Sequence, residues 1–303
     1  MKSFRRTIGV LASVAAATIA CSAIAAAAPA LPDQSSLPPQ PGIDPVFNDP
    51  GCVPSPAHPN PVVYFHGTGT QSNEFADSAR FLRDQGFCLW TRHYGTDSDT
   101  IRNNVPGHNG LGPVDDAADE LAAFVDEVLA TTGAGQVDLV GYSLGGTLTK
   151  VYIQGRDGAG KVGRSISFGA TYRGTDLVGV THVAGSALNA NRGSAEYLIG
   201  ASTFDQFEGS EFIARVNDLP DTTPGIIYTA FYTPSETVAT PYTTSMLQPV
   251  DGTSVANVDM EAACGRTFTH RDLPRSPETP HLVYWGLTRA AENTAATRQD
   301  CGS

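Results

Sequence analysis

Short apolar runs alternate along the chain with longer segments that carry helix signals. The longest of these segments, 115–131, repeats its apolar residues every three or four positions, as an amphipathic helix does. Further helices are predicted at 72–85, 144–152 and 279–292. Buried strands are predicted at 62–65, 88–90, 137–140, 165–168 and 226–231. This alternation predicts an α/β fold, in which helices cover both faces of a mostly parallel central sheet.

Three stretches fall outside the alternation. Residues 1–30 have a basic start, an apolar middle and small residues at the end, which predicts a secretory signal. Residues 31–60 are rich in proline, which predicts an extended N-terminal arm on the surface of a single domain at 61–303. Residues 171–224 are rich in Gly, Ser and Asn, and a small cap over a site is expected there.

The chain is acidic, with 19 basic and 31 acidic residues and a net charge of −12. Loss of the signal would leave −15, because Lys2, Arg5 and Arg6 would leave with it and no acidic residue would. Such a surface repels nucleic acids and anionic lipid headgroups. We therefore expect no nucleic-acid partner, and any transient contact with a lipid interface would rest on apolar side chains.

Four cysteines remain if Cys21 leaves with the signal. An even number in an exported chain predicts two disulfides, for which three pairings are possible. We favour Cys52–Cys88 together with Cys264–Cys301, because each bond would fasten a terminal segment to a structured element. The sequence contains no Cys-x-x-Cys pair, so it predicts no zinc site.

The segment Gly141-Tyr142-Ser143-Leu144-Gly145 matches the pattern Gly-x-Ser-x-Gly. It lies between a predicted strand and a predicted helix, as a nucleophile elbow requires. In such a turn the serine has a strained backbone, and only small residues fit two positions to either side. The competing interpretation is a glycine-rich turn whose serine only caps the helix. The context favours Ser143 as a nucleophile.

A serine hydroxyl needs a neighbouring base to take its proton. In folds with such an elbow the acid and then the histidine follow the serine along the chain, which leaves His182, His270 and His281. His182 falls in the cap stretch, and His281 opens the final helix. His270 lies between the last strand and that helix, so we expect it to be the base.

The acid of such a site follows the penultimate strand, and Glu236 is the first carboxylate after the strand at 226–231. Its expected task is to accept the far ring N–H of His270. Asp251 and Asp221 are the alternatives.

An oxyanion hole needs two backbone N–H donors. One should come from Leu144, which follows the nucleophile. The other should come from the loop after the first strand, where Thr68 is the expected donor and His66 helps to shape the loop.

Together these motifs resemble the secreted class 2 lipases of the α/β-hydrolase superfamily and, more distantly, the subtilis-type bacterial lipases and yeast lipase B. The segment 61–69 is similar to the family's first strand and oxyanion loop, and His270-x-x-Leu273 to the start of its final segment. The four cysteine positions resemble those of yeast lipase B. The resemblance implies an α/β-hydrolase catalytic domain at 61–303. One position departs from the family, because Glu236 stands where relatives commonly carry aspartate.

We therefore expect a secreted, extracellular and monomeric hydrolase of carboxylic esters, a lipase or esterase of acylglycerols or similar substrates. It would act through Ser143, His270 and Glu236 by way of an acyl-enzyme, without a metal or another cofactor. One alternative is a polyester or cutin hydrolase with the same triad. The other is a secreted binding protein on a hydrolase scaffold that lacks activity.

Overall fold

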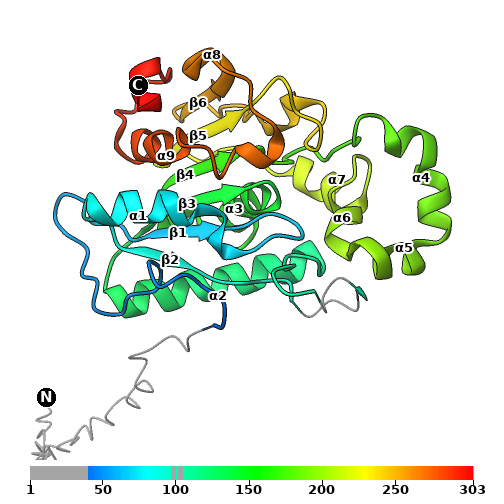
Figure 1. The fold of residues 1–303 in the computed structure, drawn as a ribbon, viewed down its shortest axis with the longest axis horizontal. Helices are drawn as coiled ribbons and strands as arrows, with labels where there is room; N and C mark the ends of the chain where they lie inside the picture. The colour runs from blue at the N-terminus through cyan, green and yellow to red at the C-terminus, as the bar shows by residue number, and fades with distance from the viewer. Residues whose placement is uncertain (1–39, 97–99, 102–104, 303) are drawn as a thin grey trace, which may run out of the picture. The chain divides into compact units, whose positions relative to one another are not determined.

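The computed structural model describes residues 40–96, 100–101 and 105–302. The signal at 1–30 and the first residues of the arm lie outside this part. Six parallel strands form one sheet, and their order differs from their order in the sequence (Figure 1). From one edge to the other the strands are β2 (Leu89–Thr91), β1 (Val62–Phe65), β3 (Val137–Tyr142), β4 (Val162–Phe168), β5 (Ile227–Tyr232) and β6 (Ser254–Asp259).

The five predicted strands are confirmed, and β6 is a strand that the apolar pattern did not reveal. It forms an edge of the sheet and pairs with β5 alone. Only Ala256 and Val258 of its six residues are buried, so it lacks the continuous apolar run that marks a central strand.

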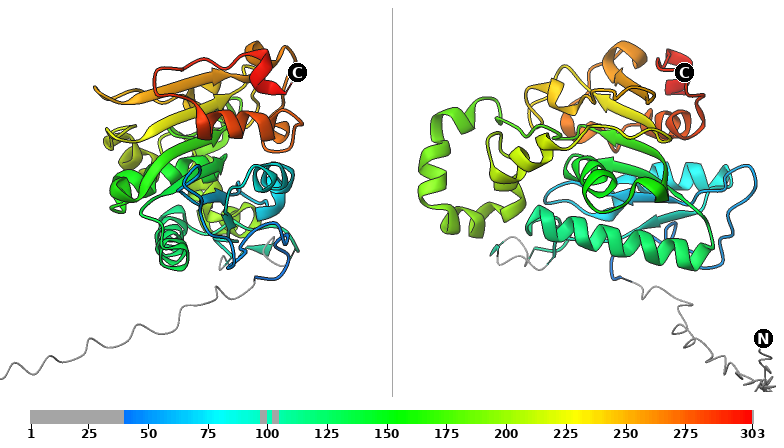
Figure 2. Two further views of the ribbon diagram at one scale, coloured as in Figure 1. Left: turned by 90° about the vertical axis from the view of Figure 1, so that its left-hand side faces the viewer. Right: turned by 180° about the vertical axis from the view of Figure 1, so that it is seen from behind.

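Helices cover both faces of the sheet (Figure 2). One face carries α1 (Ala76–Asp84) and α9 (Thr279–Thr288), and the other carries α2 (Val114–Thr132) and α3 (Leu144–Gly155). The side chains of β1 alternate between these two layers, because successive residues of a strand point to opposite faces. The side chains of residues 62 and 64 pack in the core between the sheet and helices α1 and α9. The side chains of residues 63 and 65 pack in the core between the sheet and helices α2 and α3.

Two predicted helix ends were wrong by four residues, and the helix predicted at 144–152 continues to Gly155. Ser72 does not cap a helix: it begins a 3₁₀ turn, η1 (Ser72–Phe75), and its hydroxyl lies 2.9 Å from Nδ1 of His93. The final helix ends at Thr288, not at 292. Arg289 leaves the helical conformation there, and its buried guanidinium donates to the hydroxyl of Thr229 in the sheet at 2.9 Å.

Four helices occupy most of the stretch between β4 and β5, where the cap was expected, and they lie beyond the carboxyl ends of the strands (Figure 1). They are α4 (Val180–Ala190), α5 (Arg192–Ile199), α6 (Ala201–Asp205) and α7 (Glu211–Asp218). The other short helices in the described part of the chain are η3 (Ala159–Lys161), η4 (Tyr242–Ser245), α8 (Met260–Cys264), η5 (His270–Asp272) and η6 (Arg298–Cys301).

Residues 40–60 run along the edge strand β2. The side chain of Asn48 donates to the carbonyl of Thr91 and accepts its N–H, both at 2.9 Å, and so satisfies backbone groups that an edge strand leaves open. The structure contains the disulfides Cys52–Cys88 and Cys264–Cys301, which is the favoured pairing. Within the described ranges, no helix has the length and apolar character needed to cross a bilayer.

Candidate active site

Ser143 occupies the sharp turn between β3 and α3. Its φ of 53° and ψ of −120° are a strained combination for a residue with a side chain. A Cβ added to Gly141 would overlap the backbone of Gly145, and one added to Gly145 would overlap the carbonyl oxygen of Phe65. Both glycines are therefore required by the turn, which lifts the serine hydroxyl clear of the sheet at the start of α3.

His270 begins η5, in the segment that follows β6 and α8. Its Nε2 lies 3.1 Å from Oγ of Ser143, although 127 residues separate the two in the sequence. The hydroxyl of Tyr142, the residue before the serine, donates to the carbonyl of His270 at 3.2 Å. One contact of the His270 side chain and one of its backbone carbonyl thus hold the imidazole next to the elbow.

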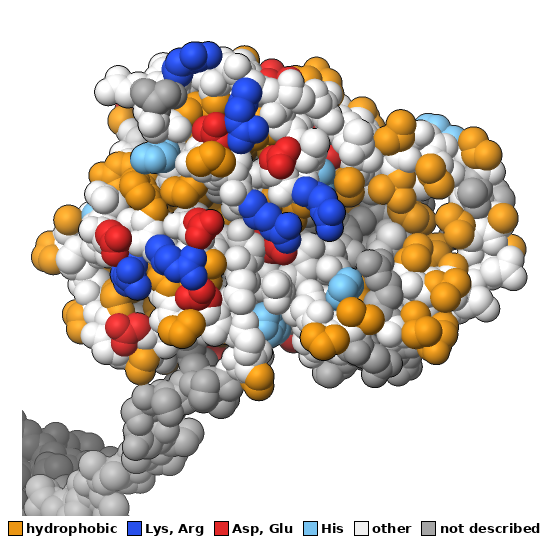
Figure 3. Space-filling model, in the orientation of Figure 1, with side chains coloured by type: hydrophobic (Ala, Val, Ile, Leu, Met, Phe, Trp, Pro, Cys, Tyr) orange, Lys and Arg blue, Asp and Glu red, His pale blue; other side chains and the backbone are white. Residues whose placement is uncertain are grey.

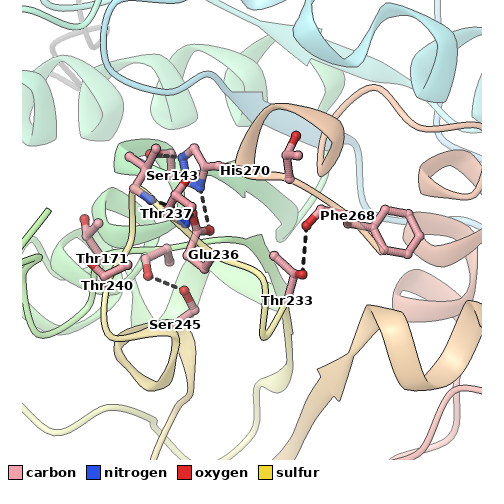
Figure 4. A network of polar contacts seen from close by, with 12 residues as sticks. Ser143, Thr171, Thr233, Glu236, Thr237, Thr240, Ser245, Phe268 and His270 are labelled. Atoms are coloured by element: carbon pink, nitrogen blue, oxygen red, sulfur yellow. Dashed lines mark hydrogen bonds and ion pairs between the residues drawn. The ribbon is translucent and has the colours of Figure 1, made fainter. Parts of the chain in front are cut away.

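Glu236 lies on the loop after β5, and Oε2 of its carboxylate is 2.7 Å from Nδ1 of His270. Oε1 accepts the backbone N–H groups of Thr237 and Val238, each at 2.8 Å. The carboxylate side chain is 2% exposed and the imidazole 7%. Figure 4 shows the imidazole between the hydroxyl and the carboxylate, with a dashed line from the ring to each of them.

The surroundings of Glu236 stabilise its negative charge. Burial raises its pKa, but the hydrogen bond and the charge of His270 and the two backbone N–H groups lower it by more, so the pKa ends below its ordinary value. A carboxylate can only accept hydrogen bonds, so Nδ1 of His270 carries a proton. Nε2 of the neutral ring is then free to accept the proton of Ser143.

Further hydrogen bonds tie together the loops that carry Glu236 and His270. The hydroxyl of Thr233, at the end of β5, donates to the carbonyl of Phe268 at 2.9 Å (Figure 4). It also lies 2.6 Å from Oε1 of Glu261. Glu236 and His270 therefore lie on two neighbouring segments that are connected by hydrogen bonds close to the site.

The alternative acids and bases lie elsewhere. Asp221 is buried and forms ion pairs with Lys150, at 2.6 Å, and with Arg173. Asp251 is exposed in a turn before β6. His182 is exposed on α4 and pairs with Glu208 at 3.0 Å.

The two remaining candidate histidines also have other partners. His281 packs its ring against Phe81 at 4.7 Å between centroids. His66 is buried, stacks on Tyr94, and bonds through Nδ1 to the carbonyl of Gly67 at 2.9 Å. Burial lowers the pKa of His66 to about 3, so it is neutral and shapes the loop.

The loop after β1 leaves one N–H group open beside the serine. The N–H groups of Gly67, Gly69 and Thr70 bond to groups within residues 67–109, whereas that of Thr68 has no partner in the part of the chain that the structure describes. The N–H of Leu144 has none there either, since the first residues of a helix lack acceptors in the preceding turn. Both expected oxyanion donors are therefore available.

Gln206 is a residue of this site that the sequence did not reveal. It follows α6, and its Nε2 donates to the hydroxyl of Thr68 at 2.7 Å, while its Oε1 accepts the hydroxyl of Thr171 at 2.9 Å. It thereby holds the loop after β1 against the loop after β4. No local pattern marks a lone glutamine in the stretch 171–224, so only the tertiary contact identifies it.

A pocket of about 320 Å³ opens over the serine. Ser143, His270 and Thr68 line it, together with apolar side chains of the segments around it. Those apolar side chains are Leu177, Phe207 and Val238. Within residues 40–96, 100–101 and 105–302 no three His, Cys, Asp or Glu side chains gather as metal ligands would. The arrangement suits nucleophilic attack by a serine hydroxyl on a carbonyl carbon.

Known proteins share this architecture. Lipase B of Aspergillus fumigatus superposes with a TM-score of 0.59 at 15% identity, over 84% of this chain and 64% of that one. This chain thus spans less than two thirds of the length of the fungal protein. The mature form of Bacillus licheniformis lipase BlEst2 superposes with a TM-score of 0.56 at 16% identity, over 78% of this chain and 94% of that one. At such identities the likeness shows a common fold.

A model of the alpha/beta hydrolase family matches residues 62–301, from the first residue of β1 to the last cysteine. The matched region includes the elbow, the imidazole and the carboxylate described above. The chain therefore belongs to the alpha/beta hydrolase family.

Proposed function

We propose that the protein is a secreted serine hydrolase of carboxylic esters, in which Ser143, His270 and Glu236 form the catalytic triad. The observation that carries the proposal is the unbroken line of hydrogen bonds from the carboxylate through the imidazole to the hydroxyl, at 2.7 and 3.1 Å. Two structural neighbours whose names include the word lipase support esters as the substrate class.

The proposed reaction has two stages. His270 takes the proton of Ser143 through Nε2 as Oγ forms a bond to the ester carbonyl carbon, and the carbonyl π electrons move to the oxygen. The N–H groups of Thr68 and Leu144 stabilise that oxyanion, which is worth about 3–4 kcal/mol for one donor in comparable sites. The tetrahedral intermediate expels the alcohol, which receives the proton from His270. Water, activated by the same imidazole, then releases the acid and restores Ser143.

Glu236 contributes by fixing the imidazole and by stabilising its positive charge when it holds the proton. Its lowered pKa keeps the carboxylate ionised through this step.

A lipid or other apolar ester is the proposed substrate. Figure 3 shows apolar side chains gathered over α4 and α5, and Leu177, which lines the pocket, lies shortly before α4 in the chain. The exposed large apolar residues on or next to these two helices are Val178, Val180, Val183, Tyr197 and Leu198. Because the chain as a whole is acidic, a transient contact with a lipid surface would rest on these side chains. The signal-like start and the two disulfides support an extracellular location.

A fluorophosphonate probe tests the proposal, because it reacts only with an activated serine. The wild-type protein should be labelled to one probe per chain, and Ser143→Ala should remain unlabelled while keeping its circular dichroism spectrum. A folded wild-type protein that is not labelled would instead be a binding protein on an inactive scaffold. A series of esters from acetate to palmitate would then define the preferred acyl chain and separate a lipase from a short-chain esterase.

A further inference from the structure

A second hollow of about 670 Å³ adjoins the pocket over Ser143. The two share five lining residues, so they lie side by side, and we refer to the pair as the depression. The shared residues are Gly69, Thr70, Tyr142, His108 and Arg271. The rest of its lining combines prolines and glycines with polar side chains such as those of Gln71 and Asn109. Its chemistry thus differs from the apolar side chains around the serine.

Arg271 gives this depression a net positive charge. The side chain is exposed, lines both hollows, and has no ion-pair partner among the residues that the structure describes. The other arginine there, Arg275, donates to both carboxylate oxygens of Glu74 at 2.5 and 2.7 Å, and that pair is neutral overall. Glu74 is the only acidic residue among the described ones that line either hollow.

The histidines of the second hollow add a polar surface. Burial lowers the pKa of His93, so it is neutral near pH 7. Nδ1 of His108 is buried and has no hydrogen-bond partner within the described ranges. Because this nitrogen is enclosed, the open charge that a ligand in the hollow would meet is that of the Arg271 guanidinium.

The proton transfer in the proposed reaction indicates which part of the ester would lie in this hollow. His270 must deliver its proton to the leaving alcohol, so the alcohol lies on the imidazole side of Ser143. Arg271 follows His270 directly and lines the depression where the two hollows meet. The acyl chain would then lie in the pocket over Ser143, against the apolar side chains of Leu177, Phe207 and Val238.

We infer that the second hollow binds the alcohol part of the ester and that Arg271 selects substrates whose alcohol carries an anionic group, such as a phosphate or a carboxylate. The inference rests on the proposed function. Arg271 here is a specificity determinant: the guanidinium pairs with the anion of the bound ester and takes no part in the acyl transfer.

A matched set of soluble esters tests this inference. The esters are 1-hexanoylglycerol, 1-hexanoylglycerol 3-phosphate and the hexanoyl ester of glycerate, which share an acyl chain and differ in the charge of the alcohol. For the wild-type enzyme at low ionic strength, kcat/KM should be about 5–10 times higher for at least one anionic ester than for the neutral one. That ratio should approach one in 0.5 M salt. The two anionic esters distinguish phosphate from carboxylate as the preferred group.

Arg271→Gln should lower the ratio about 5–10-fold, mainly through KM, and Arg271→Lys should retain most of it. The matched control is Arg83→Gln, which neutralises an exposed arginine of α1 that pairs with Asp84 and lines neither hollow. The inference is overturned if the wild-type ratio is one or less, or if Arg271→Gln changes it by less than twofold. Failure of the proposed function would differ, since neither the neutral nor the anionic esters would then be hydrolysed.

Discussion

The two oxygens of the Glu236 carboxylate have different partners. Oε2 faces Nδ1 of the His270 imidazole, and Oε1 accepts the backbone N–H groups of the next two residues in its own loop. This arrangement accounts for a glutamate where relatives of the family that the sequence resembles commonly carry aspartate. The longer side chain could adopt many rotamers, but the bonds to its loop leave it one position. The glutamate is therefore as well placed for the proposed role as a shorter acid would be.

Glu236→Gln should lower kcat about 10³–10⁴-fold, as the loss of the acid does in comparable triads. Oε1 of the amide can still accept the two loop N–H groups, so its NH₂ group would face Nδ1 and favour the wrong tautomer of His270. The measurement is steady-state hydrolysis of a p-nitrophenyl ester. Asp251→Asn is the control, because that residue is exposed and was one of the two alternatives to Glu236 as the acid. A near-normal rate for Glu236→Gln would remove the carboxylate from the mechanism.

The residues of the candidate triad could be selected from the sequence because each follows a strand in a fixed order. The tight turn around Ser143 is a local property of five residues, so its glycines are visible in the sequence. Glu236 and His270 were found by their places after the later strands. The sequence could not exclude Asp221, since its burial against Lys150 is a tertiary contact between distant segments.

The features that escaped prediction depend on contacts across the chain. The edge strand β6 buries only Ala256 and Val258, and its sequence Ser-Val-Ala-Asn-Val-Asp shows neither a strict alternation nor a continuous apolar run. Gln206 reaches the loop after β1 across 138 residues of sequence, and nothing near it in the chain indicates that contact. The end of the final helix depends on Arg289, whose guanidinium donates a hydrogen bond to the hydroxyl of Thr229 in β5.

Gly145→Ala should destabilise the protein by about 3 kcal/mol or more and abolish esterase activity. The added methyl group would overlap the carbonyl oxygen of Phe65 and lie 2.7 Å from that of His66, so the start of α3 would have to move. Denaturation in urea and labelling by the fluorophosphonate measure the two effects.

The control for that variant is Gly160→Ala in η3, where an added Cβ meets nothing within 4 Å. It should change the free energy of unfolding by no more than about 0.5 kcal/mol. Equal effects of the two substitutions would show that the close approach at the elbow has no energetic importance.

Gln206→Ala should lower kcat about 10-fold through a change in the position of Thr68, the proposed oxyanion donor. Gln206 touches the hydroxyl of that threonine and acts through it, so Thr68→Val should have a similar effect and the double variant should lose little more than either. The measurements are kcat and KM for each variant, with melting temperatures to detect a loss of stability. If the two effects on kcat multiply, the two residues do not act as a unit.

Asp138 should make the stability of the protein fall as the pH rises from about 4 to 6. Its side chain is buried in β3, and burial raises its pKa to about 6, against the smaller lowering effects of a hydrogen bond from Asn60 and of the charge and N–H of Arg164. The unfolded chain has the ordinary aspartate pKa of about 3.9. The native state therefore binds more protons than the unfolded state between these two values, and stability decreases through that interval as the carboxyl ionises.

Asp138→Asn removes this dependence, because the amide is neutral at every pH and its oxygen can still accept the hydrogen bond from Asn60. The variant should match the wild-type protein at pH 4 and exceed it at pH 8 by on the order of 1–3 kcal/mol, since one pKa unit corresponds to about 1.4 kcal/mol. Urea denaturation at both pH values measures the difference, with Asp251→Asn as the exposed control. A difference between Asp138→Asn and wild type that is the same at pH 4 and pH 8 would mean that the buried carboxyl does not titrate in this interval.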